Sequence, residues 1–222
     1  MTANRPNDAR EATASSPAEQ VLAHAQAGRE VVQDFVALAA SLEWDLGKRY
    51  LRERGNKAFL SDSSPVPYVV NNDGSLSRNA AEVFFTSLAA AEKDGKLEGD
   101  IFVLELGIGV GLFARYLLDN LRELCWRNKK DHYERLCYIL ADNSPRMLQD
   151  VLRHGVLAEH PGRYRVRRVD AMHPEATLPH EPGLLGKPRP FRAVFLNYLL
   201  DCLPAAVLQW EGEQVRELHV RT

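Results

Sequence analysis

Three glycines at alternate positions, Gly107, Gly109 and Gly111, stand in the stretch VLELGIGVGLF, between an apolar run and an amphipathic pattern. Glycine adopts backbone conformations that other residues avoid and lets a ligand approach the main chain. The N–H groups of a following helix attract polar or anionic groups. This spacing therefore predicts a ligand-binding turn. The pattern is not the dinucleotide fingerprint G-x-G-x-x-G, because its third glycine would fall at Leu112.

Polar side chains stand at the ends of the apolar runs that we predict to be strands. They are Glu105, Asp142, Asp170 and Asn197. In a parallel sheet the carboxyl ends of the strands meet at one edge, where ligands bind. A carboxylate at such a strand end can accept hydrogen bonds from both hydroxyls of a ribose, a geometry that dinucleotide enzymes also use. The solvated end of a strand is the alternative for each acid.

The elements that must position these groups alternate between strands and helices. One helical pattern follows the glycine turn, and another starts with Ser144 as N-cap and Pro145 as its first residue. This order predicts an α/β fold with a Rossmann-like, doubly wound parallel sheet. The predicted strands are 101–106, 136–142, 163–170 and 192–197.

The first hundred residues have a different texture. Residues 1–16 have the composition of a disordered leader. Residues 17–96 read as a helical region, with two helices before Trp44, one ending at Gly55, a short strand at 68–70 and a last helix stopping near Gly95. Residues 97–222 form the predicted Rossmann-like domain.

The segment ELGIGVG, Glu105 to Gly111, resembles motif I of the class I S-adenosylmethionine-dependent methyltransferases. This resemblance implies that the glycines lie under the methionine part of the cofactor and that Glu105 helps to place its amino group. Asp142 would bind the ribose, and Asp170 with Ala171 would face the adenine. The cofactor would be S-adenosylmethionine, with S-adenosylhomocysteine as product. The implied cofactor-binding residues are Glu105, Gly107, Gly109, Gly111, Asp142, Asn143, Asp170, Ala171 and Asn197.

Two further segments, YILADNSPRMLQ at 138–149 and NYLLDCLP at 197–204, resemble the MidA family of methyltransferases. That family includes mitochondrial enzymes that methylate an arginine of a respiratory complex I subunit, and its segment reads N-E-x-x-D-A-x-P. Here Tyr198 stands in place of the glutamate and Cys202 in place of the alanine, and Ile108 replaces a proline of the glycine turn. The resemblance implies a methyl acceptor that is a protein side chain.

Three residues are the candidates for contact with the acceptor: Asn197, Tyr198 and Asp201. An arginine nucleophile is cationic and must lose a proton, so a carboxylate such as Asp201 would orient it. Tyr198 could form an aromatic wall for a flat or cationic acceptor. The alternatives are a core tyrosine for Tyr198 and a charge at a helix N-terminus for Asp201.

Beyond Pro204 the sequence predicts only a hairpin, fewer strands than the methyltransferase sheet normally has. We therefore expect a domain that is incomplete at its C-terminus. An exposed sheet edge would follow, covered by a partner domain or by a second copy in a homodimer. A nonenzymatic interaction module with the S-adenosylmethionine fold is one alternative function. A nucleotide-dependent oxidoreductase is another.

The composition limits the classes of partner and cellular location that the sequence predicts. The net charge of −2 gives no basic footprint for nucleic acid, and no apolar segment approaches the roughly 20 residues that span a bilayer. Three cysteines in no disulfide or zinc pattern indicate reduced thiols and a cytoplasmic protein. The histidines are scattered without the spacing of metal ligands, so the sequence predicts no metal site.

Overall fold

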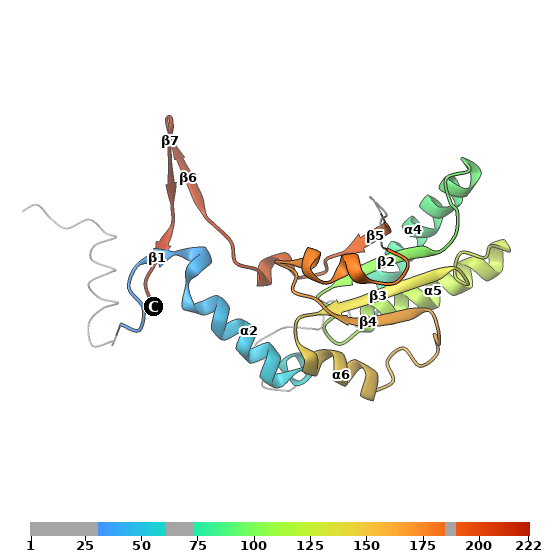
Figure 1. The fold of residues 1–222 in the computed structure, drawn as a ribbon, viewed down its shortest axis with the longest axis horizontal. Helices are drawn as coiled ribbons and strands as arrows, with labels where there is room; N and C mark the ends of the chain where they lie inside the picture. The colour runs from blue at the N-terminus through green and yellow to red at the C-terminus, as the bar shows by residue number, and fades with distance from the viewer. Residues whose placement is uncertain (1–30, 61–72, 185–189) are drawn as a thin grey trace, which may run out of the picture. The chain divides into compact units, whose positions relative to one another are not determined.

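The computed structural model describes residues 31–60, 73–184 and 190–222 (Figure 1). These residues form two compact units. One contains the described residues of 43–205, and the other joins residues 31–42 with residues 206–222. The predicted leader at 1–16 and the predicted strand at 68–70 lie outside the described residues.

The larger unit is built on a parallel sheet of four strands in the order β4-β3-β2-β5, which Figure 1 shows side by side. The predicted α/β fold with a Rossmann-like parallel sheet is therefore confirmed. The strands are β2 (Ile101–Leu106), β3 (Leu136–Asp142), β4 (Tyr164–Arg168) and β5 (Phe191–Phe195).

The two faces of the sheet are covered differently. All six residues of β2 are buried, as expected for a strand enclosed on both sides. On one face lies a large apolar cluster with side chains from α4 (Ser75–Lys93), α5 (Leu112–Asn128) and α6 (Pro145–Arg153). On the other face a smaller cluster packs against the segment 169–184, which carries the 3-10 turns η3 (Pro174–Ala176) and η4 (Leu178–His180). The sequence pattern does not predict this second cover.

The helices that precede the sheet terminate at the positions that the sequence indicates. Helix α2 (Leu42–Arg54) is followed by Gly55 at φ +57°, and α4 ends shortly before Gly95 at φ +68°. Glycine adopts this left-handed conformation without strain, which makes it a frequent helix stop. A short helix, α3 (Lys57–Leu60), follows α2. Among the described residues, no helix is both long and apolar enough to cross a bilayer.

The smaller unit contains the predicted hairpin, formed by the antiparallel strands β6 (Leu208–Glu211) and β7 (Gln214–Glu217). The prediction of a second helix before Trp44 is wrong for residues 31–37. There β1 (Val36–Ala37) pairs with β8 (His219–Val220), and η1 (Leu38–Ala40) follows.

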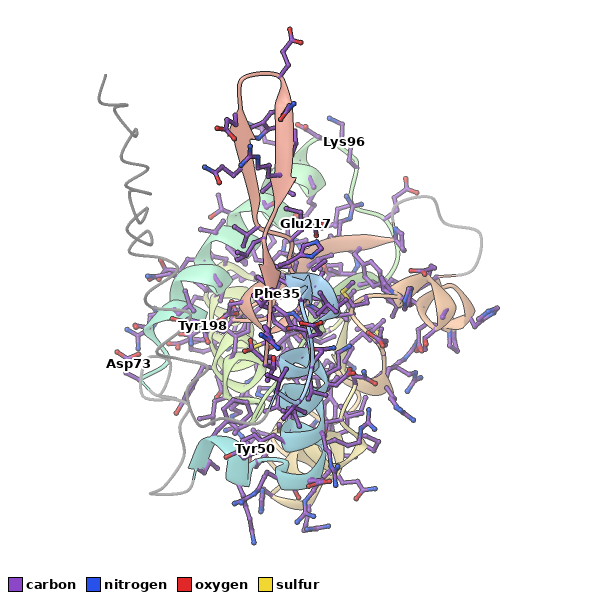
Figure 2. All side chains as sticks on the ribbon, turned by 90° about the vertical axis from the view of Figure 1, so that its left-hand side faces the viewer. Phe35, Tyr50, Asp73, Lys96, Tyr198 and Glu217 are labelled. Carbon is purple, nitrogen blue, oxygen red and sulfur yellow. The ribbon has the colours of Figure 1, made fainter. Side chains whose placement is uncertain are left out.

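Long-range contacts explain this difference. The N–H of Gln33 donates to the main-chain oxygen of Thr222, and the side-chain oxygen of Gln33 accepts from the N–H of Leu42. The guanidinium of Arg221 lies over the ring of Phe35, which Figure 2 labels. Pairing with the end of the chain thus overrides the local helical periodicity.

Candidate active site

The turn between β2 and α5 needs glycine at all three alternate positions. Gly107, Gly109 and Gly111 have φ angles of +73°, +52° and +81°. These lie in the left-handed region, where other residues are strained. Between them Ile108 and Val110 are buried, so the turn is fixed in the core at every second residue.

Two of the glycines also prevent a clash. A Cβ atom on Gly107 would lie 3.0 Å from Cδ1 of Leu199, in the segment after β5. A Cβ atom on Gly111 would lie 3.1 Å from Cγ1 of Val151 in α6. Gly107 therefore permits the close approach of the β2 and β5 ends, whereas Gly111 permits the packing of the turn on α6.

Asp142 connects the glycine turn to the next helix. Its Oδ1 accepts a 2.8 Å hydrogen bond from the N–H of Ser144. Burial raises the pKa of Asp142 to about 6, although hydrogen bonds from the N–H groups of Ser144, Gly109 and Asn143 act to lower it. Ser144 caps α6 as predicted, because its Oγ accepts from the N–H of Met147 at 3.3 Å.

Asp170 makes the equivalent connection between the ends of β3 and β4. Its Oδ1 accepts from the N–H of Met172 at 3.0 Å, and its Oδ2 accepts from the side-chain amide of Asn143 at 3.4 Å. The two acids predicted at successive strand ends are thus linked through Asn143.

A cavity of about 140 Å³ lies at these strand ends. Most of the surface that lines it is apolar, and the side chains with polar groups are those of Lys48, Arg52, Asp142, Asn143, Ser144, Asp170, Tyr198 and Cys202. Seven of the residues predicted from the sequence line it: Gly107, Gly109, Asp142, Asn143, Asp170, Ala171 and Tyr198.

The other predicted residues do not line this cavity. Glu105 is only 1 % exposed and accepts a 2.8 Å hydrogen bond from the Tyr138 hydroxyl; burial raises its pKa to about 8. Gly111 packs on α6. Asn197 is half-buried, and its Nδ2 has no hydrogen-bond partner among the described residues. Asp201 is exposed in the 3-10 turn η5 (Leu200–Cys202).

Tyr198, labelled in Figure 2, follows β5 and is 61 % exposed, so it is not a core tyrosine. Its φ of +48° is unusual for an aromatic residue. Such backbone strain is found most often at functional sites. The carbonyl of Tyr198 accepts a 3.5 Å hydrogen bond from the thiol of Cys202, which also lines the cavity.

No protein-family model and no curated protein matches the chain. Among solved structures, it is similar to a COG1565 superfamily member from Burkholderia thailandensis, a candidate methyltransferase bound to S-adenosylhomocysteine. The identity is 17 % and the TM-score 0.36, over 69 % of this chain and 36 % of the other.

A second, uncharacterised COG1565 superfamily protein from the same organism has 20 % identity and a TM-score of 0.34, over 68 % of this chain and 33 % of the other. The chain thus spans about a third of the length of each solved structure.

Helices α2 and α3 supply cavity residues that the sequence interpretation missed: Lys48, Leu51, Arg52 and Phe59. Two hydrogen bonds hold these helices to α6. Asp150 Oδ2 accepts from the N–H of Asn56 at 3.1 Å, and the Ser144 hydroxyl donates to the carbonyl of Leu51 at 3.4 Å. The available signal was the spacing of Lys48 and Arg52, which puts both cations on one face of a helix.

Proposed function

We propose that this cavity binds S-adenosylmethionine and that the protein is a methyltransferase. The observation that carries the proposal is the meeting of the glycine turn, Asp142 and Asp170 around one cavity at the carboxyl ends of a parallel sheet. Apolar walls with a few convergent polar groups are typical of cofactor sites.

The residues present fit the parts of this cofactor. Asp142 would accept hydrogen bonds from the ribose hydroxyls, and Asp170 would accept from the adenine amino group. The main chain at Gly107 and Gly109 would pass beside the methionine part. The cavity volume of about 140 Å³ is below the roughly 300–1,000 Å³ of typical ligand sites. Part of the cofactor would therefore extend past the cavity or displace α2 and α3.

The bound cofactor would supply an activated methyl group, so the protein chiefly has to align it with a nucleophile. We place the acceptor beside Tyr198, whose exposed ring at the cavity suits a flat or cationic group. The MidA resemblance extends this proposal to a protein side chain as acceptor. Asp201 and Asn197 lie in the same segment and would contact that acceptor outside the cavity.

Calorimetric titration of the purified chain with S-adenosylmethionine, S-adenosylhomocysteine and NAD tests the proposal. We expect micromolar binding of the first two and none of NAD. Asp142→Asn and Asp170→Asn should each weaken binding at least about tenfold, since a ligand hydrogen bond to a charged group contributes roughly 1.5–3 kcal/mol. Asp94→Asn, at an exposed acid after α4, is the matched control and should bind as the parent does.

The other outcomes separate the alternatives. Preferential binding of NAD would favour a nucleotide-dependent oxidoreductase. Binding of none of the three ligands would overturn the proposal and favour a nonenzymatic module.

A further inference from the structure

A second cluster of side chains that could bind a metal ion lies between the C-terminal end of α4 and the loop that joins α5 to β3. Glu92 is in the last turn of α4, and Asp131 and His132 belong to the loop. One ligand atom from each lies within 4.8 Å of the other two. None of the three lines the cavity described above. The sequence pattern predicts no metal site because Glu92 is far from the other two along the chain.

His132 is the residue whose environment is otherwise unexplained. It has no exposed surface, and neither of its ring nitrogens has a hydrogen-bond partner among the described residues. Leaving a buried polar atom unsatisfied costs about 1–3 kcal/mol, so such atoms are rare in native proteins. The ring packs beside Phe85 at a centroid distance of 5.8 Å. The imidazole is therefore held by packing and by a long contact with Glu92, and neither ring nitrogen makes a hydrogen bond of ordinary geometry.

The distance from His132 to Glu92 fits a shared ion better than a direct hydrogen bond. Nε2 lies 3.5 Å from Oε2 of Glu92, beyond the ordinary hydrogen-bond range of roughly 2.7–3.2 Å. Two ligands that each lie about 2.1 Å from a tetrahedral zinc ion are separated by about 3.4 Å. Asp131, with its side chain 63 % exposed, can supply the third ligand from the solvent side.

Two cations face the same carboxylates. The Lys130 ammonium donates to Glu92 Oε2 at 2.5 Å and is the main cause of the lowered pKa of Glu92. Arg135 donates to Asp131 at 3.4 Å, a weak contact. The Lys130 side chain is 36 % exposed, so it can turn into solvent when a divalent ion takes its place.

We propose that Glu92, Asp131 and His132 form a binding site for a divalent transition-metal ion, with Zn²⁺ as the best fit. One imidazole and two carboxylates suit this ion, and water would complete its coordination. The ion would cross-link the end of α4 to the loop before β3 and would give one nitrogen of the buried imidazole a partner. The site is independent of the function proposed for the cavity.

The test is calorimetric titration of the chelator-treated full chain with ZnCl₂, together with thermal unfolding with and without the metal. We expect one equivalent to bind and to raise Tm. Glu92→Gln and Asp131→Asn alter partly exposed side chains, so both variants should fold. Each should weaken binding at least about tenfold, since even outer-shell changes at metal sites cost 10–100-fold.

Two further variants sharpen the result. Lys130→Met removes the competing ammonium and should bind Zn²⁺ more tightly than the parent. His173→Ala, at an exposed histidine beside Glu175, controls for adventitious surface binding and should change nothing. Absence of binding, or binding of equal strength in Glu92→Gln and Asp131→Asn, would overturn the proposal and leave a direct His132–Glu92 ion pair as the explanation.

Discussion

The Tyr138 hydroxyl donates a 2.8 Å hydrogen bond to Oε2 of Glu105 between two neighbouring strands of the sheet. Both side chains are buried, and Tyr138 belongs to the cluster between the sheet and its helices. Burial raises the pKa of Glu105 to about 8, although the Tyr138 bond acts to lower it. Glu105 is therefore a core residue that is mostly protonated at pH 7, and the sequence interpretation predicted neither its burial nor its raised pKa.

Replacement of Glu105 by glutamine should change how stability depends on pH. Glu105 titrates near pH 4.3 when unfolded and near 8 when folded, so the parent protein loses stability as pH rises between these values. The loss should amount to about 2.5 kcal/mol between pH 5 and 7, and Glu105→Gln should not show it. Urea unfolding at pH 5, 6, 7 and 8 measures the difference between the two proteins. Parallel pH profiles would contradict a raised pKa.

Gly111→Ala should destabilise the protein for two reasons. Alanine is strained at the left-handed φ of this position, and its Cβ would press against a side chain of α6. A φ of +81° costs about 1–2 kcal/mol for alanine, and the contact with Val151 adds to this. Gly47→Ala is the matched control in the interior of α2, where the added Cβ meets nothing within 4 Å. It should stabilise by up to about 1 kcal/mol. Thermal unfolding measures both, and equal effects would show that the turn is not under this constraint.

Glu181→Gln should weaken the packing of the segment 169–184 on the second face of the sheet. Its carboxylate, with a side chain only 4 % exposed, accepts from Arg165 at 3.0 Å and from Arg167 at 2.9 Å, both in β4. Burial would raise the pKa of Glu181, but these hydrogen bonds lower it overall, so its contribution to stability is lost as the pH falls below about 4.5.

At neutral pH we expect Glu181→Gln to cost about 3 kcal/mol in denaturant unfolding, because two arginines lose their counter-ion. Glu175→Gln, in a pair that is 70 % exposed on both sides, should cost less than about 0.5 kcal/mol. A small effect at both positions would rule out the proposed role of Glu181.

Tyr133→Phe should weaken the packing of the loop 155–163 on the loop between α5 and β3. The Tyr133 hydroxyl lies 2.8 Å from Nδ1 of the buried His160, and Nε2 of His160 lies 3.2 Å from Asp119 in α5. Removing the hydroxyl leaves the imidazole with one fewer partner, at a cost of about 1–3 kcal/mol. Tyr50→Phe on α2 is the control and should change the unfolding free energy by no more than about 0.5 kcal/mol.

The same histidine predicts an acid sensitivity. Burial is the main cause that lowers the pKa of His160, so the folded protein binds its proton less readily than the unfolded chain. Stability should therefore fall as the pH drops below about 6.5, where the unfolded histidine becomes charged. A slope in that range that survives His160→Gln would assign the sensitivity to other groups.

Local sequence patterns were sufficient to predict the sheet and part of the cavity lining. The strand 136–142, the cap at Ser144 and the glycine turn were all predicted because each depends on neighbouring residues. Asp142 and Asp170 both line the cavity because the carboxyl ends of the strands of a parallel sheet lie at one edge.

The errors have a common physical cause. Three features depend on contacts between segments that are distant in the sequence. They are the formation of β1, the position of Lys48 and Arg52 at the cavity, and the proximity of Glu92 to His132. The burial of Glu105 was not predicted for a related reason. Whether an acid at a strand end points into solvent or into the core depends on which face is covered there, and the pattern of a doubly buried strand does not distinguish the two faces.

The pairing of Val36 with Val220 sets an order of events during synthesis. Translation proceeds at roughly 5–20 residues per second, and all the strands of the parallel sheet are made before β8 leaves the ribosome. The larger unit can therefore complete its core while β1, made much earlier, still lacks its partner. Val32 and Phe35, which are exposed even in the finished unit, would meet chaperones and proteases throughout that interval. A segment translated before the parallel sheet would thus acquire its structure after it.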